Sequence, residues 1–307
     1  MNLRRNKMYY YTMFYQNIAC DFEIKEAISI SKPEHIDIYV EENEPPQEVF
    51  EQIEKGYFDG ITKVKSWIYV KDLVIYYIEN GNHILVHTLK SCHNEMTKVT
   101  FLTGLGMAMA LTQKGYVPMH GGALCVNDGG YIVTGDSGSG KSSTMTQLRA
   151  KGGVFMADDL AVIDCNSMDL LPGFPVQKLC GNMVDKLELD KSELIYIGEA
   201  RDKYEQLLSE DEYLYEKRPL KGIFQISKHD GDELKCYEVI GNEKLKIIAN
   251  NIFCIFFVKN FPMDAESMMK YLRIAQEVKV YRIERPEGKD TLDSISEYCY
   301  QKMLQNC

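Results

Sequence analysis

A stretch near the middle of the chain has the residue types and the spacing of a phosphate-binding loop. Residues 135–142 read GDSGSGKS and satisfy the pattern GxxxxGK[ST]. In such loops the glycines let the backbone wrap until its N–H groups point at phosphate oxygens, the lysine contacts the β- and γ-phosphates, and the hydroxyl binds Mg²⁺. An apolar strand is predicted directly before the loop and a helix directly after it, so the helix dipole adds positive potential at the phosphates. We therefore predict a nucleotide-binding site here.

The residues expected to bind the nucleotide form one continuous run: Gly135, Asp136, Ser137, Gly138, Ser139, Gly140, Lys141, Ser142 and Ser143. Lys141 is also expected to act in catalysis, because its charge lies on the phosphate that is transferred. The hydroxyl of Ser142 is expected to be a ligand of the metal ion.

Two consecutive aspartates, Asp158 and Asp159, interrupt the next apolar run, VFMADDLAVID. An acidic residue after such a strand is the usual metal partner of this kind of loop. Neighbouring side chains on a strand point to opposite faces, unless the strand ends or bends between them. One carboxylate can then hold the metal or its water shell while the other faces an acceptor as a base. His120, which precedes the hairpin that leads into the loop, would keep such a carboxylate ionised and oriented if it lies beside it.

The first 95 residues predict a small antiparallel β-rich module. Three runs rich in β-branched and aromatic residues, SWIYV, LVIYYI and HILVHTL, lie between residues 66 and 89. The tetrapeptide ENGN separates the last two, and Asn-Gly is a strong signal for a tight hairpin. No catalytic constellation lies in this part of the sequence, so we expect the module to be structural or to dock the substrate.

Strands and helices alternate over residues 96–307 and predict one α/β domain. Leu102, Leu105 and Met109 fall on one helical face, and Gly115 is a plausible helix stop. MHGGALCV and YIVTG are expected to form a hairpin around the turn NDGG, and SSTMTQLRAK the helix after the loop. The strands GIFQIS and KVYRIERP and three more helical patterns follow. The predicted fold is a P-loop-type core whose sheet is covered by helices.

The composition argues against several classes of partner. The chain has 307 residues, a formal net charge of -10 and no basic run, which is unlike a nucleic-acid-binding protein. No apolar run approaches the ~20 residues of a membrane span, and the N-terminus lacks the pattern of a signal peptide. The nine cysteines are odd in number, widely spaced and without a CxxC pair, which favours reduced thiols in the cytoplasm. We expect a cytoplasmic protein without nucleic-acid or membrane partners, and a homo-oligomer remains open.

Taken together, MHGGALCV, GDSGSGKSS and GGVFMADDLAVI resemble the catalytic domain of bacterial HPr kinase/phosphorylase. That family shows a histidine followed by glycine, a short strand, the loop GxSGxGKS and a tandem ADD after a strand, in this order and at like spacing. The resemblance is specific over about residues 104–162 and looser at LPGFPVQKL, RPLKGIFQI and VYRIERP. The looser stretches are more similar to HPr-kinase-like proteins encoded beside peptide-modification clusters, including the lasso-peptide serine kinases. The implied core fold is shared with ATP-dependent phosphoenolpyruvate carboxykinase.

The resemblance implies a role for each of the singled-out residues. Asp158 is implied to be the base toward the acceptor hydroxyl, His120 to support it, and Asp159 to lie near the metal. ATP and Mg²⁺ are the implied cofactors of a kinase that moves the γ-phosphate to a hydroxyl, serine first of all, of a peptide, a protein or a small molecule. The first 95 residues do not look like the regulatory domain of HPr kinases, and the basic segment that helps those enzymes grip HPr has no counterpart. These departures argue against HPr itself as the acceptor.

Three other functions stay open at this point. A carboxykinase-like lyase needs a second metal site and a cluster of arginines. A GTPase-type switch needs a glycine after the second strand, and none follows the aspartate pair. A non-catalytic nucleotide sensor is expected to lose one of His120, Asp158 and Lys141, and all three are present. The arginines that the lyase would need are scattered in the second half of the chain: Arg201, Arg218, Arg273, Arg282 and Arg285.

Overall fold

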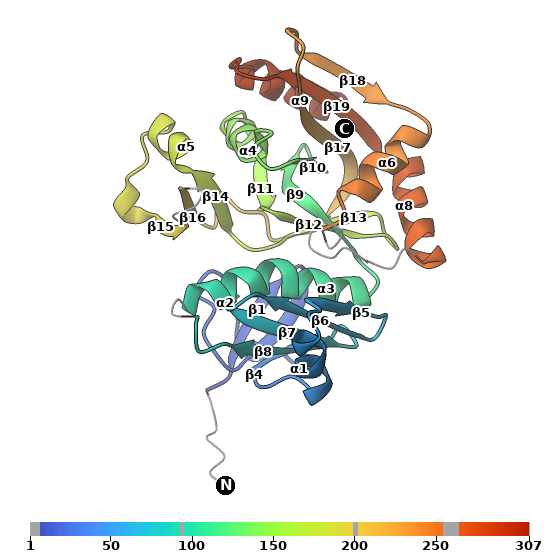
Figure 1. Cartoon of the computed structure of the whole chain (residues 1–307). Coiled ribbons are helices and arrows are strands. Elements are labelled where there is room, and N and C mark those ends of the chain that lie inside the picture. The colour runs from blue at the N-terminus through green and yellow to red at the C-terminus, as the bar shows by residue number, and fades with distance from the viewer. Residues whose placement is uncertain (1–6, 93–94, 199–201, 254–263, 307) are drawn as a thin grey trace. The chain divides into compact units, whose positions relative to one another are not determined.

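The computed structural model describes residues 7–92, 95–198, 202–253 and 264–306 (Figure 1). The described residues fall into two compact units. One holds the residues up to Tyr116 together with Phe253, and the other holds those from Val117 to Ile252 and from Asp264 onward. The helical segment that begins at Glu95 therefore groups with the first unit. A boundary between independent domains after residue 95 stays a prediction.

One eight-stranded sheet forms the first unit, in the order β3-β1-β2-β4-β8-β7-β6-β5. The predicted hairpin is confirmed, since β7 and β8 pair antiparallel around a turn in which Asn80 and Gly81 have positive φ. The expectation of an antiparallel sheet is wrong for β4, which runs parallel to both of its neighbours, β2 and β8. The chain crosses through a helix and three strands between β4 and β8, and no local pattern signals so distant a pairing. The strands are β1 (Tyr9–Met13), β2 (Gln16–Cys20), β3 (Ile28–Ser29), β4 (Ile38–Glu42), β5 (Asp59–Ile61), β6 (Lys65–Val70), β7 (Val74–Glu79) and β8 (His83–Thr88).

Helices cover both faces of this sheet at β7, which explains why nearly every residue of that strand is buried. Ile75 and Tyr77 pack with Val49 of α1 (Gln47–Glu54) on one face. On the other face the Tyr76 hydroxyl donates to the Lys98 carbonyl at 2.6 Å. The covering segment there consists of α2 (Glu95–Phe101), the π-helical η1 (Leu102–Gly106) and α3 (Met107–Gln113). Its buried residues include Leu102, Leu105 and Met109, as the sequence predicts, and Gly115 with a φ of 92° follows its end.

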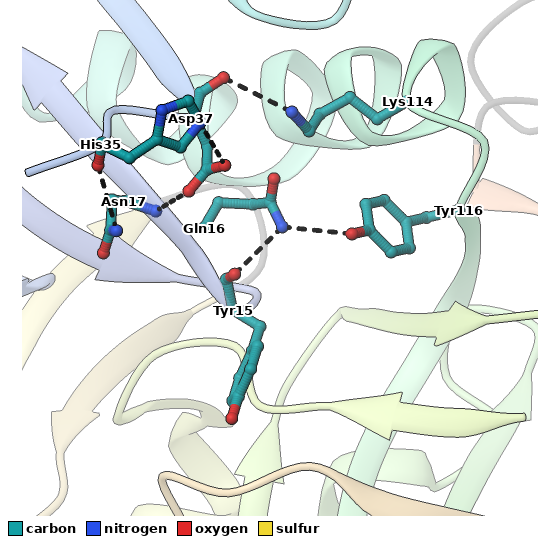
Figure 2. A network of polar contacts seen from close by, with 7 residues as sticks. All are labelled: Tyr15, Gln16, Asn17, His35, Asp37, Lys114 and Tyr116. Carbon is teal, nitrogen blue, oxygen red and sulfur yellow. Dashed lines mark hydrogen bonds and ion pairs between the residues drawn. The ribbon is translucent and has the colours of Figure 1, made fainter. Parts of the chain in front are cut away.

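A polar network ties the end of α3 to the β1–β2 hairpin within this unit (Figure 2). The buried Gln16 side chain donates to the Tyr116 hydroxyl at 3.4 Å and to the Tyr15 carbonyl at 3.0 Å. Lys114 reaches the Asp37 carbonyl at 3.5 Å, and the Asp37 carboxylate accepts from the backbone N–H of Asn17 at 2.8 Å. Residues 114–116 are therefore fixed by side-chain contacts inside the first unit.

The second unit is built around a ring of paired strands. β9 pairs with β12 through its first half and with β10 and β11 through its second half. β13 joins β12 to β17, and β17 runs parallel to β10, which closes the ring. β19 and β18 extend the sheet beyond β17. The strands are β9 (Val117–Val126), β10 (Gly129–Gly135), β11 (Val154–Ala157), β12 (Leu160–Asp164), β13 (Asp169–Leu171), β17 (Arg218–His229), β18 (Lys235–Val239) and β19 (Lys279–Pro286).

Most of the predicted elements of this unit are confirmed. The β9–β10 hairpin turns at Asn127 and Asp128, both with positive φ, and the helix after the loop is α4. The start of the predicted helix before Glu277, residues 262–263, lies outside the described residues. None of the helices in the described ranges has the length and apolar character to cross a membrane. The helices are α4 (Lys141–Ala150), α5 (Gly181–Lys186), η2 (Lys191–Glu193), α6 (Asn242–Asn250), α8 (Ala265–Glu277) and α9 (Leu292–Gln305).

A small three-stranded antiparallel sheet belongs to the second unit and has the order β14-β16-β15 (yellow to yellow-green in Figure 1). Its strands are β14 (Val176–Cys180), β15 (Ile195–Gly198) and β16 (Lys203–Leu207). Gln177 faces α4, where it donates to the Thr146 hydroxyl at 3.1 Å and accepts from Arg149. Because successive strand residues point to opposite faces, Lys178 faces away from α4.

Candidate active site

The glycine-rich loop joins the end of β10 to the start of α4, and its glycines hold conformations that other residues avoid. Gly135, Gly138 and Gly140 have φ values of 139°, 77° and 108°. A Cβ on Gly135 would lie 2.0 Å from the Ile226 carbonyl oxygen of the neighbouring strand, whereas a Cβ on Gly138 would meet nothing within 4 Å. Gly135 is thus required by both its φ and its close contact with β17.

Two cations bracket this loop. The Lys141 ammonium donates to the carbonyls of Gly135 at 2.7 Å and Asp136 at 3.1 Å, and burial lowers its pKa. From β19, the Arg285 guanidinium donates to the carbonyls of Ser139 at 2.8 Å and Gly138 at 3.3 Å. In a trans peptide the N–H points away from the carbonyl of the preceding residue. By holding the Ser139 carbonyl, Arg285 therefore helps to turn the Gly140 N–H to the opposite side of the loop.

The aspartate pair occupies a break between β11, which ends at Ala157, and β12, which begins at Leu160. Asp159 has a φ of 61°, a left-handed conformation that an aspartate tolerates better than a branched residue. Asp158 accepts hydrogen bonds at both oxygens, from the Asp159 N–H at 2.9 Å and from the Lys178 N–H at 2.8 Å. Two backbone donors therefore hold its carboxylate. Among the described residues, no side-chain cation lies within 4 Å of it.

Asp159 instead forms an ion pair. Its carboxylate lies 3.0 Å from the ammonium of Lys178, whose side chain is only 15% exposed. Burial opposes the charge of Lys178, but the Asp159 and Glu205 carboxylates outweigh it and raise the lysine's pKa. Lys178 thus contacts both aspartates through different groups, with its N–H on Asp158 and its ammonium on Asp159.

The pKa values of the two carboxylates are consequently shifted in opposite directions. Burial, together with the charge of Asp159, raises the pKa of Asp158 to about 6. Burial acts in the same direction on Asp159, but the charges of Lys178 and Lys203 outweigh it and lower the pKa. Near neutral pH Asp159 is a permanent anion, while Asp158 is a carboxylate poised to take up a proton.

His120 lies on β9 directly opposite Leu160 of β12, next to the aspartate pair. Its imidazole hydrogen-bonds to the backbone of Asp159. Burial and the charge of Lys141 lower its pKa, so the ring is neutral at physiological pH. The buried Asn251 fixes the histidine's backbone, since its carbonyl accepts from the His120 N–H at 2.7 Å.

The structure brings the predicted residues together. The charges of Asp158 and Asp159 act on Lys141. The charges of Lys141 and Asp159 in turn act on His120. Of the scattered arginines, Arg201 lies outside the described residues, and Arg285 alone of the others contacts the loop. The remaining three bond to nearby glutamates: Arg218 to Glu216, Arg273 to Glu277 and Arg282 to Glu243.

A cavity of about 460 Å³ opens on the side of the loop where Arg285 lies. Three of its lining residues, Ser139, Thr144 and Thr291, have buried hydroxyl oxygens without a hydrogen-bond partner in the described structure. Buried polar atoms are nearly always hydrogen-bonded to protein, water or ligand, so these three hydroxyls can bind either water or a polar ligand in this cavity.

Sequence reasoning missed three basic residues of this site, Lys178, Lys203 and Arg285. Lys178 and Arg285 lie in the stretches LPGFPVQKL and VYRIERP, whose looser family likeness was the available signal. A basic residue between apolar strand residues was a second signal for Lys178. Lys203 has no sequence signal, because only the pairing of β14 with β16 brings it near the aspartates.

Comparisons with known proteins agree with the motifs. No protein-family model matches the chain. Two curated proteins named HPr kinase/phosphorylase, from two strains of Treponema pallidum, are each 33% identical over 92 residues, 29% of this chain and 29% of each relative. The match thus spans less than a third of the length of these relatives.

A solved structure of the Hpr(Ser) kinase/phosphatase from Coxiella burnetii aligns with 61% of this chain and 91% of its own, at 12% identity and a TM-score of 0.30. A TM-score this low carries no argument about the site. The sequence match to the Treponema proteins confirms that this chain resembles the HPr kinase/phosphorylase superfamily.

Proposed function

We propose that the second unit is an ATP-dependent kinase that transfers the γ-phosphoryl group to a hydroxyl. Serine in a peptide or protein is the first candidate acceptor, and a small molecule is the other. The proposal rests on the placement of Asp158. Backbone N–H donors orient both of its carboxylate oxygens, and its charge acts on Lys141, which belongs to a complete GxxxxGKS loop. The resemblance to HPr kinase/phosphorylases supports the same class of reaction.

The nucleotide would lie across the loop. The backbone N–H groups of the loop and of the first turn of α4 would bind the phosphates, with Lys141 on the β- and γ-phosphates. The nucleoside would occupy the neighbouring cavity, where the hydroxyls of Ser139, Thr144 and Thr291 offer hydrogen bonds to the ribose and the base. Arg285 borders both sites and would hold the loop in its binding conformation.

The residues present fit Mg²⁺ in a nucleotide complex. Ser142 and Asp159 supply the hard oxygen donors that this ion prefers, and the lowered pKa of Asp159 keeps its carboxylate ionised. No cluster of three or more histidine, cysteine or acidic side chains that could hold a metal occurs in the described ranges. This is typical of Mg²⁺ that is held by one or two protein oxygens and otherwise by phosphates and water. When bound, the ion would neutralise charge that develops on the phosphate oxygens.

The transfer step needs a base for the acceptor hydroxyl, and Asp158 fits that task. The acceptor oxygen forms a bond to the γ-phosphorus, the bond from that phosphorus to the β,γ-bridging oxygen breaks, and ADP leaves. The hydroxyl proton passes to the Asp158 carboxylate, whose pKa is raised to about 6 by burial and by Asp159. His120 would position Asp159 through its hydrogen bond to that residue's backbone.

The test is phosphoryl transfer by the full chain from γ-labelled ATP to a panel of serine peptides, free amino acids and HPr. We expect Lys141→Ala to abolish Mg·ATP-dependent transfer, because the main point charge on the β- and γ-phosphates is lost. The matched control is Lys151→Ala at the other end of α4, where the lysine pairs with Glu297. Transfer at the wild-type rate by Lys141→Ala would refute the site, and absence of ATP binding by the folded wild type would refute the function.

A further inference from the structure

A second lysine of the small sheet, Lys203, shares a face with Lys178. In the β14–β16 pairing, Lys178 lies opposite Glu205 and Cys180 lies opposite Lys203. Residues two apart on a strand share a face, so these four side chains project from the same side of the sheet. Lys178 meets Asp159 at 3.0 Å from this side. The face that carries Lys203 is therefore the face that borders the aspartate pair.

The charge of Lys203 acts on three residues that come from different elements. It favours the ionised form of Asp159, and it disfavours the charged forms of His120 and of Lys141. These residues belong to the β11–β12 break, to β9 and to the first turn of α4. Lys203 thus lies on the side of the site where the loop lysine, the histidine and the aspartates converge.

Lys178 and Lys203 differ in what they contact. The ammonium of Lys178 is engaged by Asp159, with Glu205 opposite it on the next strand. Within the ranges that the structure describes, Lys203 has no ion pair with a carboxylate and is only partly exposed. A cation that faces an active site without such a pair is able to bind an anionic substrate group.

We propose that Lys203 contacts the transferring phosphoryl group, as a second cation on the side of the γ-phosphate opposite the glycine-rich loop. The inference rests on the proposed kinase function and adds a residue to it. The acceptor side of the site carries three carboxylates, those of Asp158, Asp159 and Glu205. Their negative charge repels the negatively charged γ-phosphate. A cation supplied from outside the phosphate loop is a recurrent means of stabilising that charge in phosphoryl transfer.

The decisive measurement compares two nucleotides that differ only in the γ-phosphate. Binding of ADP and of the β,γ-imido analogue of ATP, each with Mg²⁺, is measured by calorimetry on the full chain. Lys203→Met removes the charge but keeps the length of the side chain, and Lys203→Arg restores a charge. Lys191→Met serves as the matched control, because Lys191 lies in η2 and pairs with Asp185 at 2.8 Å on the surface.

We expect Lys203→Met to weaken binding of the ATP analogue about tenfold or more, the usual effect of losing a charge-assisted hydrogen bond, and to leave ADP binding within about twofold. Lys203→Arg should recover most of the loss, and Lys191→Met should change neither affinity. Equal weakening of both nucleotides would overturn the proposal, because the contact would then not involve the γ-phosphate. Unchanged nucleotide affinities would also overturn it, and a raised KM for the acceptor in that case would assign Lys203 to acceptor binding instead.

These outcomes separate the inference from the function on which it rests. A wild-type chain that binds neither nucleotide contradicts the kinase proposal itself. A wild-type chain that binds and transfers phosphate, with Lys203→Met indistinguishable from it, contradicts the role of Lys203 alone.

Discussion

Replacing Asp158 by asparagine is expected to lower kcat by about 10²–10⁴-fold, the usual contribution of a general base. Asparagine has the same shape but takes no proton from the acceptor. It also fits the hydrogen bonds less well, because both Asp158 oxygens accept from backbone N–H groups, those of Asp159 and Lys178. In either rotamer the new NH₂ group opposes one of these donors, at a cost of about 1–3 kcal/mol. No loop residue bonds to Asp158 in the described structure, so the Kd for nucleotide should change little.

The pKa of Asp158 adds a second signature to this prediction. With a pKa raised to about 6, the carboxylate is about nine-tenths ionised at pH 7 and about one-tenth ionised at pH 5. The base works only when ionised, so kcat/KM of the wild type should fall about tenfold as the pH falls from 7 to 5. An aspartate at its ordinary pKa of 3.8 would stay mostly ionised over this range. The residual activity of Asp158→Asn should not show this fall between pH 7 and pH 5.

The assay is γ-labelled ATP transfer between pH 5 and 8, with nucleotide Kd by calorimetry and a denaturant titration to establish that each variant is folded. Asp164→Asn is the matched control, because Asp164 ends β12 on the same chain segment and its side chain accepts a hydrogen bond from the nearby Asn166 N–H. Normal turnover by Asp158→Asn would refute the reasoning. Normal turnover by Asp158→Asn with an inactive Asp159→Asn would mean that the two roles are exchanged.

Two further predictions concern the parts that position this base. His120→Ala should lower kcat less than Asp158→Asn does and should leave the nucleotide Kd unchanged. The reason is that the imidazole bonds to the Asp159 backbone and takes no proton from the acceptor. A loss of kcat as large as that of Asp158→Asn in the same transfer assay would contradict this prediction. Gly135→Ala should lower the free energy of unfolding by about 3 kcal/mol or more, since its φ is 139° and its Cβ would lie 2.0 Å from the Ile226 carbonyl. Gly138→Ala, with open space around it, should cost only about 1 kcal/mol, and equal losses for the two variants in urea titrations would refute the steric argument.

The contiguous segment that holds the glycine-rich loop was predictable from the sequence. The β9–β10 hairpin, the glycine-rich loop and α4 follow one another directly, and each is signalled by local rules: turn residues at 127–128, glycines where φ is positive, and a helix after the loop. The break at Asp158 and Asp159 was also visible, because two charged residues interrupt an apolar run. Local sequence thus singled out the residues to which we assign the proposed chemistry.

Contacts between distant segments decided how those residues behave. Lys178 reaches both aspartates from a strand that the sequence marks only weakly, and it separates their acidities. Arg285 reaches the loop across 146 residues of chain, and Lys203 borders the site only because β16 pairs with β14. The parallel pairing of β4 in the first unit was hidden for the same reason. Periodicity records which face of a strand is buried, but not which strand lies beside it, and both the charge state of an aspartate and the direction of a strand depend on that neighbour.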